Sequence, residues 1–173
     1  YSDDWIEEAE KRGLLNLKTT PDALPYFIHS KNVELFTKHH VFSESELYSR
    51  YEILLENYSK TLHIEALTMI DMTKKDIIPA VLEYQGEIAR IANGKKQLMP
   101  NIQCYLEEEL LNKISKLGNS LYSKLDDLEK SVLEAKTHTD PLDTAKYYRE
   151  SVFINMQHLR GVVDELETLV SKK

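Results

Sequence analysis

The sequence predicts an all-α protein, an antiparallel three-helix bundle of long helices preceded by short N-terminal helices. Apolar residues recur every three or four positions through residues 43–173, which is the period of a helix with one buried face. Five glycines and five prolines in 173 residues are fewer than a turn-rich β fold requires. The apolar content of 42% and the charged content of 29% indicate an ordinary globular chain rather than a disordered one.

The N-terminal part is expected to form short helices joined by a connector. Ser2 is suited to cap a first helix, and Gly13 is suited to end it. In the connector, Thr20 followed by Pro21 has the pattern of a helix cap with a first-turn proline. A further short helix is predicted at residues 30–39. This part differs in design from the rest of the chain, and we interpret it as the end of a different structural region.

Residues 43–94 are predicted to form the first long helix. Ser43 and Glu46 make a capping box, in which each side chain satisfies a backbone N–H at the helix start. An Asn-Gly pair at residues 93–94 favours a stop. A straight helix of this length would span roughly 75 Å, so it must pair with other long helices or bend. Pro79 offers a place for a bend, because it removes a backbone donor and crowds the preceding turn.

Two more long helices are predicted at residues 101–137 and 140–171. The first has an apolar seam that advances by four and three residues, as in left-handed bundles: Leu106, Leu110, Ile114, Leu117, Leu121, Leu125, Leu128 and Val132. The second is expected to be capped by the Asp-Pro pair at residues 140–141. Its apolar face comprises Ala145, Tyr148, Val152, Met156, Leu159, Val163, Leu166 and Val170. Short links require the three helices to fold back on one another.

Composition argues against several classes of function. No apolar run approaches the roughly 20 residues of a membrane span, so no membrane partner is expected. A net charge of −7, with basic runs of only two lysines, argues against nucleic-acid binding. Cys104 is the one cysteine and cannot form an internal disulfide, so we expect a reducing, cytoplasmic setting. Because the chain begins at Tyr1 rather than Met, we expect a fragment of a longer protein or a processed chain.

The histidines lack the spacing of a metal site. They are His29, His39, His40, His63, His138 and His158. No two stand four apart on a helix, and neither HExxH nor Cys-x-x-Cys occurs. His158 precedes Arg160 and Gly161, and phosphotransfer bundles display a reactive histidine near a basic and a small residue. The spacing is one residue short of that pattern, and we interpret Gly161 more simply as a close contact between helices.

Three carboxylates lie among apolar residues of the first long helix, at Glu65, Asp71 and Asp76. A helical di-metal site needs Glu-x-x-His on two helices, and the sequence has none. We interpret Asp71 as a surface ion-pair partner of Lys74 or Lys75, with an acidic cluster that meets a partner surface as the alternative. Two methionines and three tyrosines of this helix are interpreted as core or interface residues: Met69, Met72, Tyr48, Tyr51 and Tyr58. No catalytic, cofactor-binding or metal-binding residue is predicted.

Four runs of sequence carry a resemblance to a known family. They are EAEKRGLLNLKTTPDALPYF, VFSESELYSRYEILLENYSKTLHIEALTMIDM, DIIPAV and AKYYRESVFINMQHLRGVVDELETLV. Through them, essentially the whole chain resembles the C-terminal region of type III glutamine synthetases. The resemblance implies that residues 1–42 are the end of the catalytic region and that residues 43–173 form a bundle. From about Thr61 onward that bundle would be an extension peculiar to type III.

The resemblance also implies a parent enzyme and its partners. The parent would join ammonia to glutamate through a γ-glutamyl phosphate, with ATP and Mg²⁺ or Mn²⁺, in a large double-ring oligomer. Its catalytic motifs belong to upstream regions, so this chain is expected to be a non-catalytic structural and assembly domain that needs no cofactor of its own. Its expected partners are the catalytic domain of the same chain and neighbouring subunits of a homo-oligomer. The alternatives are a free-standing helical protein–protein interaction module and a phosphotransfer domain.

Overall fold

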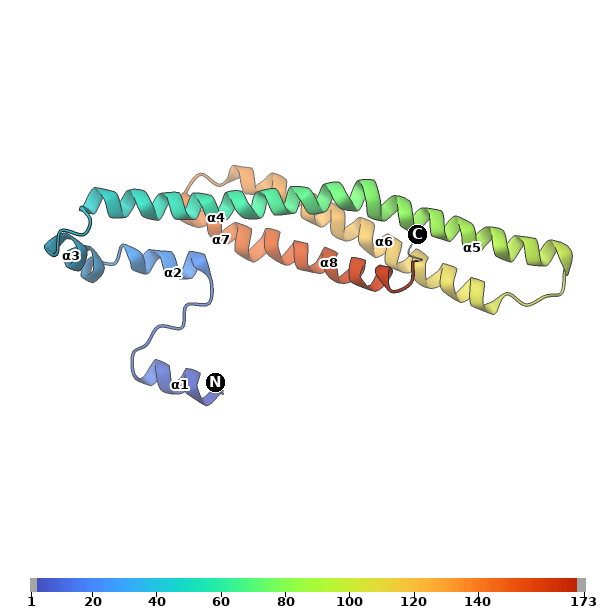
Figure 1. Cartoon of the computed structure of the whole chain (residues 1–173), viewed down its shortest axis with the longest axis horizontal. Helices are drawn as coiled ribbons and strands as arrows, with labels where there is room; N and C mark the ends of the chain where they lie inside the picture. The colour runs from blue at the N-terminus through green and yellow to red at the C-terminus, as the bar shows by residue number, and fades with distance from the viewer. Residues whose placement is uncertain (1–2, 171–173) are drawn as a thin grey trace. The chain divides into compact units, whose positions relative to one another are not determined.

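A computed structural model describes residues 3–170, which form helices and loops without a strand, so the predicted all-α class with three long helical segments is confirmed (Figure 1). Ser2, the expected first cap, lies outside the described residues. The chain forms two compact units. One contains the residues up to Thr61 together with His138–Arg149, and the other contains Leu62–Thr137 and the residues from Glu150 onward. The division expected between residues 42 and 43 concerns membership of a catalytic region and stays a prediction.

The first unit begins with the short helices α1 (Asp3–Lys11) and α2 (Thr20–Phe27). Gly13 ends α1 as predicted: it has a φ of 74°, a conformation that glycine adopts without steric cost. The predicted cap at Thr20 is wrong. The cap of α2 is Thr19, whose Oγ accepts the Asp22 N–H at 3.3 Å. Pro21 occupies the second helical position, where a missing N–H costs nothing, so the cap lies one residue earlier than expected.

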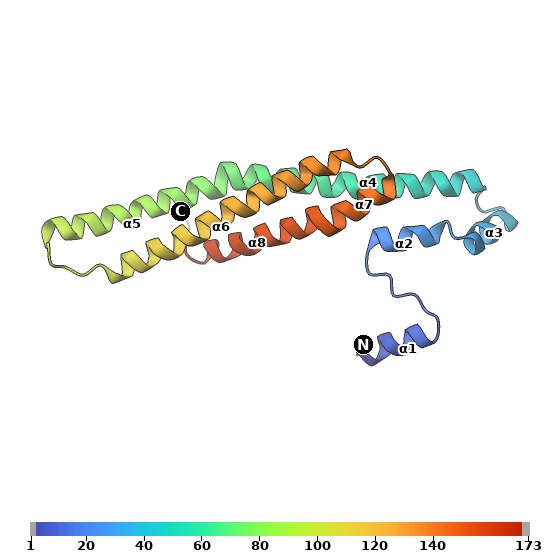
Figure 2. The same cartoon turned by 180° about the vertical axis from the view of Figure 1, so that it is seen from behind.

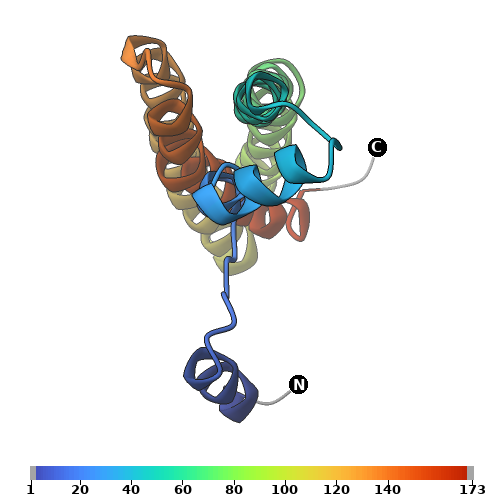
Figure 3. The same ribbon diagram turned by 90° about the vertical axis from the view of Figure 1, so that its left-hand side faces the viewer.

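Helix α3 (Ser30–Lys38) follows, and aromatic rings join it to its neighbours. The Phe36 ring lies 6.2 Å from that of Phe27 and 5.8 Å from that of Phe42, between ring centroids. Helix α2 packs against α3 and also against α7 (Pro141–Tyr147), which the end-on view of Figure 3 shows in orange-red beside the blue α2. The first unit is therefore built from segments that lie far apart in the sequence.

Both predicted caps of the long segments in this unit are confirmed. At the start of α4 (Glu44–Met72), the Ser43 N–H donates to Oε2 of Glu46 at 2.8 Å, and the Glu46 N–H donates to Oγ of Ser43 at 3.3 Å. Hydrogen bonds that the Ser43 N–H and the Ser43 hydroxyl donate to this carboxylate lower the pKa of Glu46. At the start of α7, Oδ1 of Asp140 accepts the Asp143 N–H at 2.9 Å. Capping side chains thus fix where each segment begins.

In the second unit, α4 continues into a π-helical turn, η1 (Thr73–Ile77), and then into α5 (Ile78–Leu98). The Ile78 N–H donates to the Thr73 carbonyl, five residues back. Pro79 explains this turn, because its ring would crowd the carbonyl four residues earlier and a wider turn relieves that crowding. The ribbon changes direction here (Figure 1). Pro79 therefore perturbs the helix where the sequence indicates, but it does not end it.

The predicted stop at residues 93–94 is wrong, since α5 continues to Leu98 and the Met99 N–H still donates to the Lys95 carbonyl at 2.9 Å. Two lysines of this last turn pair with carboxylates of the next helix, α6 (Tyr105–Glu134), and these pairs stabilise helix beyond the glycine. A short 3-10 turn, η2 (Ala135–Thr137), ends α6. The loop between α5 and α6 therefore lies four residues later than expected.

Helix α6 lies between α5 and α8 (Phe153–Glu167) and packs on both (Figures 1 and 2). A second π-helical turn, η3 (Tyr148–Val152), precedes α8. The predicted seam is buried from Ile114 to Val132 except at Leu117, which is half-buried. Leu106 contradicts the prediction, because its side chain is 68% exposed. The apolar face predicted for the third segment is buried from Ala145 to Leu166.

Replacing one seam leucine tests where the core lies. Leu128 is fully buried on α6, so Leu128→Ala should reduce the free energy of unfolding by about 2–5 kcal/mol. Leu133→Ala, on the same helix, is the matched control: its side chain is 66% exposed, and we expect a change within about 0.5 kcal/mol. Urea unfolding monitored by circular dichroism measures both. Equal effects at the two positions would contradict the packing described here.

Candidate functional site

The structure does not gather the histidines, acids and cysteine into a metal centre. Among residues 3–170, no group of three or more His, Cys, Asp or Glu side chains is placed to hold a metal ion. Asp71 pairs with Lys75 at 2.6 Å, which confirms one of the two ion pairs expected of it. Glu65 and Asp76 are exposed on α4 and η1. The prediction that the chain has no catalytic, cofactor-binding or metal-binding residue stays a prediction.

His158 and its neighbours lie on the outer side of α8. His158 is exposed, and Arg160 pairs with Asp164 at 3.6 Å along the same helix. The interpretation of Gly161 as a close contact between helices is wrong: the glycine is exposed, and a Cβ built there would have no atom within 4 Å. No packing constraint in the second unit therefore requires a small residue at this position.

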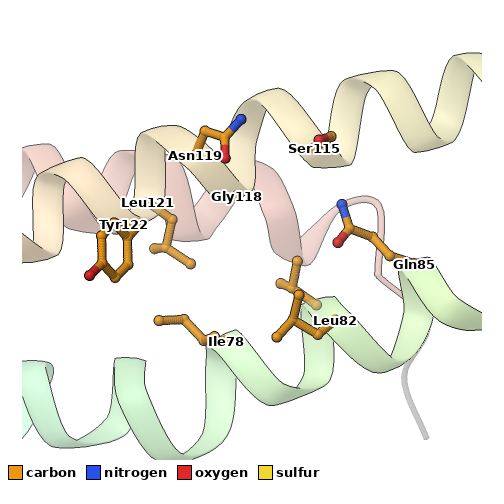
Figure 4. A pocket seen from close by; sticks show the side chains of 9 residues that line it. Ile78, Leu82, Gln85, Ser115, Gly118, Asn119, Leu121 and Tyr122 are labelled. Carbon is orange, nitrogen blue, oxygen red and sulfur yellow. The ribbon is translucent and has the colours of Figure 1, made fainter.

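A pocket of about 260 Å³ lies between α5 and α6 in the second unit (Figure 4). Ile78 and Leu82 of α5 point toward Leu121 and Tyr122 of α6 across this space. The polar groups of the lining are the amides of two residues and the hydroxyls of two others: Gln85, Asn119, Ser115 and Tyr122. None of the nine lining residues is a carboxylate, imidazole or amine that would activate a nucleophile. Its lining suits an apolar group with a hydrogen-bonding end.

The end of the α5–α6 hairpin holds the least exposed carboxylate of any ion pair in the described chain. Nζ of Lys95 donates to Oε1 of Glu107, whose side chain is only 9% exposed. This hydrogen bond lowers the pKa of the Glu107 carboxyl and raises the pKa of Lys95. Lys96 and Glu108 form a second, more exposed pair beside it at 2.9 Å. The two pairs connect the last turn of α5 to the first turn of α6.

Beyond these ion pairs lies a segment that we call the hairpin tip, residues 97–106. It contains no charged residue, and four of its large apolar side chains are exposed: Leu98, Met99, Tyr105 and Leu106. Sequence analysis missed this surface, because it placed Leu106 in the buried seam and treated the loop as a plain connector. The signal was present in the sequence as ten consecutive uncharged residues in a chain that is 29% charged.

Comparison with known proteins identifies related sequences. The family model described as the glutamine synthetase C-terminal domain matches residues 1–96. A glutamine synthetase of Butyrivibrio fibrisolvens is 42% identical over 173 residues, which is all of this chain and 25% of that protein. A type-3 glutamine synthetase of Dictyostelium discoideum is 33% identical over 180 aligned residues, covering all of this chain and 24% of that protein. The chain spans about a quarter of the length of these relatives.

A third relative extends the comparison to a further organism. A glutamine synthetase of Bacteroides fragilis is 25% identical over 171 residues, which is 96% of this chain and 24% of that protein. The resemblance seen in the sequence is thus confirmed over the whole chain. Of the helices within residues 3–170, none combines the length and the apolar character that a membrane crossing requires.

The Glu107 pair predicts a specific pH dependence of stability. Because the folded-state pKa of Glu107 is lowered, its ionised form stabilises the fold above the ordinary carboxyl pKa of about 4.3, and this contribution is lost as the pH falls through the lowered value. Glu107→Gln should therefore lower the melting temperature near neutral pH, and the difference from the unaltered chain should disappear in strong acid. Thermal unfolding followed by circular dichroism between pH 2 and pH 7 measures it.

Glu108→Gln is the matched control for that experiment. Glu108 is the neighbouring carboxylate, pairs with Lys96 and is 51% exposed, so solvent screening should leave a smaller change. A difference for Glu107→Gln that persists unchanged into acid would show that ionisation of this carboxyl does not contribute to stability.

Proposed function

Because the chain belongs to the glutamine synthetase C-terminal domain family, we propose that it serves as the helical structural and assembly domain of a glutamine synthetase of type III. The observation that carries the proposal is the match of the entire chain to about a quarter of much longer glutamine synthetases. In this proposal the domain packs on the catalytic domain of the same protein and on neighbouring subunits of a homo-oligomer. The parent enzyme operates in the cytoplasm, a setting that suits a single buried thiol.

In this proposal, the reaction of the parent enzyme takes place in those regions of the parent that lie outside the match to this chain. The complete enzyme makes glutamine from glutamate, ammonia and ATP with Mg²⁺ or Mn²⁺ in this proposal. Such metals need several oxygen ligands at one place, and the residues described here do not fit that requirement. The pocket between α5 and α6 offers no carboxylate either. In this proposal the domain has a structural and assembly role, and the rest of the parent enzyme carries out the reaction.

The isolated chain should form no glutamine. When it is incubated with glutamate, ammonia, ATP and Mg²⁺ or Mn²⁺, chromatographic analysis should detect no product above a protein-free control, while the complete parent enzyme forms glutamine under the same conditions. Measurable glutamine formation by the isolated chain would overturn the proposal that it is non-catalytic.

The assembly role is tested in the parent. Removing the part that corresponds to this chain should lower the mass of the oligomer in sedimentation velocity, because contacts between subunits are lost. A truncated parent that retains the mass expected for the full oligomer would contradict an assembly role. Sequence upstream of Tyr1 that encodes no ligase would instead favour the free-standing interaction module.

A further inference from the structure

We propose that the pocket between α5 and α6 binds a small neutral molecule that carries an aryl group at one end and an amide at the other (Figure 4). This binding role goes beyond the assembly role described above and does not depend on it. It follows from three features of the second unit: the helix faces that line the pocket, the contacts that hold those helices together on both sides of it, and the polarity of its two ends.

One face of each helix lines the pocket. The lining residues of α5 begin at Ile78 and end at Gln85, and those of α6 begin at Ser115 and end at Tyr122, with members at positions i, i+3, i+4 and i+7 of each helix. Residues at this spacing share one side of a helix. The two helices run in opposite directions, so Ile78 lies toward Tyr122 and Gln85 toward Ser115 (Figure 4). Seven residues of helix place these two ends roughly 10 Å apart.

The pocket reaches from solvent into the contact between the helices. Leu82 and Tyr122 of its lining are exposed, whereas Val81 and Leu121 are buried. Gly118 also lines it, and a Cβ built at this glycine would have no atom within 4 Å. The glycine therefore serves no close packing, and its missing side chain leaves open space in which a ligand can lie.

The two helices are connected on both sides of the pocket. Lys74 of η1 pairs with Glu129 of α6 beyond one end, and two lysines of the last turn of α5 pair with carboxylates of α6 beyond the other. The π-helical turn η1 ends at Ile77, immediately before the first lining residue, and such turns are frequent at functional sites. A space that is held in this way is already formed, so a ligand enters it with little reorganisation of the protein.

The two ends of the pocket differ in polarity. At one end, Ile78, Leu121 and Tyr122 present two branched aliphatic side chains and an aromatic ring, which suit an aryl group. At the other end, Ser115 and Gln85 present a hydroxyl and a carboxamide. A carboxamide both donates and accepts hydrogen bonds, so its best partner is a group that does both, such as another amide.

The polar groups of the lining have hydrogen-bonding capacity to spare. Within residues 3–170, the side chains of Gln85, Ser115 and Asn119 make no hydrogen bond to another residue. None of the nine lining residues is charged, so a charged group inside the pocket would lose hydration without gaining a counter-charge. The net charge of −7 also disfavours anions. The ligand is therefore neutral.

The volume of the pocket sets the size of the ligand and the expected affinity. A cavity of about 150 Å³ accommodates benzene, and this pocket of about 260 Å³ has room for an aryl ring with a short chain. Phenylpropanamide, which joins a phenyl ring to an amide through two methylene groups, matches both the size and the polarity of the two ends. A molecule of this size should bind with a dissociation constant of roughly 0.1–1 mM.

Titration of the ¹⁵N-labelled chain with phenylpropanamide, followed by NMR, tests the site. Backbone signals of residues 78–85 and 115–122 should shift and saturate. Phenylpropanoate, which has the same body and a charged carboxylate, is the matched ligand control and should bind at least about tenfold more weakly. Absence of saturable shifts up to about 10 mM amide, or equal affinities for the amide and the carboxylate, would overturn the proposal.

A pair of glycine variants locates the ligand. Gly118→Leu places a side chain in the open space of the pocket and should weaken amide binding at least about tenfold, because a filled cavity has no room for the ligand. Gly161→Leu, on α8, is the matched control: a Cβ there also meets no atom within 4 Å, and the affinity should be unchanged. Circular dichroism verifies that both variants are folded. Equal affinities of the two variants would place the ligand elsewhere and reject the pocket.

A glutamine pair tests the polar end. Gln85→Leu keeps the bulk of the side chain and removes its amide, so it should bring the affinities for phenylpropanamide and phenylpropanoate closer together by weakening the amide. Gln157→Leu, at an exposed position on α8, should leave the preference for the amide intact. A preference that survives Gln85→Leu at full strength would contradict the assigned orientation of the ligand.

Discussion

The second unit depends on one helix being shared between two neighbours. α6 packs on α5 along one side and on α8 along another, and its buried residues include Leu121, Leu125 and Leu128. A helix that is shared in this way needs a broader apolar stripe than a helix with a single partner. Ser131 and Val132 show the breadth of this stripe, because two consecutive residues are buried near the end of α6. The Ser131 hydroxyl donates to the Leu128 carbonyl at 2.9 Å, so the wider stripe leaves this hydroxyl satisfied.

Polar contacts then fix the register in which η1 and α8 pack against α6. Lys74 of η1 pairs with Glu129 of α6, and Lys113 of α6 pairs with Glu165 of α8. The side-chain amide of Asn155 donates to the Asp127 carbonyl at 3.4 Å, joining α8 to α6 through a main-chain group. Each exposed pair contributes about 1 kcal/mol or less, so these contacts select a register rather than supply the stability. The apolar seam supplies the stability.

Local signals predicted much of this fold. The capping box at Ser43 and the cap at Asp140 depend on a few adjacent residues, so the sequence contains all the information they need. The seam from Ile114 to Val132 follows from helical periodicity alone. Pro79 indicated the place of a perturbation, but the sequence did not indicate the form it takes, a π-helical turn at residues 73–77.

The sequence predictions that are wrong share a cause, because each outcome depends on residues that are distant in the sequence. The helix continues past Gly94 because Lys95 and Lys96 find carboxylates on α6, twelve residues away along the chain. Leu106 is exposed although it fits the seam, because α8 ends before it. The absence of a helix contact at Gly161 likewise depends on which face of α8 meets α6. Periodicity identifies an apolar face, but the length of the partner helix decides how much of that face is covered.

The length of α8 also bears on the surface that the second unit exposes at the hairpin tip. Near the hairpin tip, Ala92 and Cys104 are buried, and so is the carboxylate of Glu107. Two helices cannot bury all the apolar residues that three would cover, so the excess is displayed at the tip. Charge pairing immediately below the tip holds that surface in place without adding net charge to it. Covering the tip with another apolar surface would remove hydrocarbon from water at little entropic cost, and this gain is available only through association.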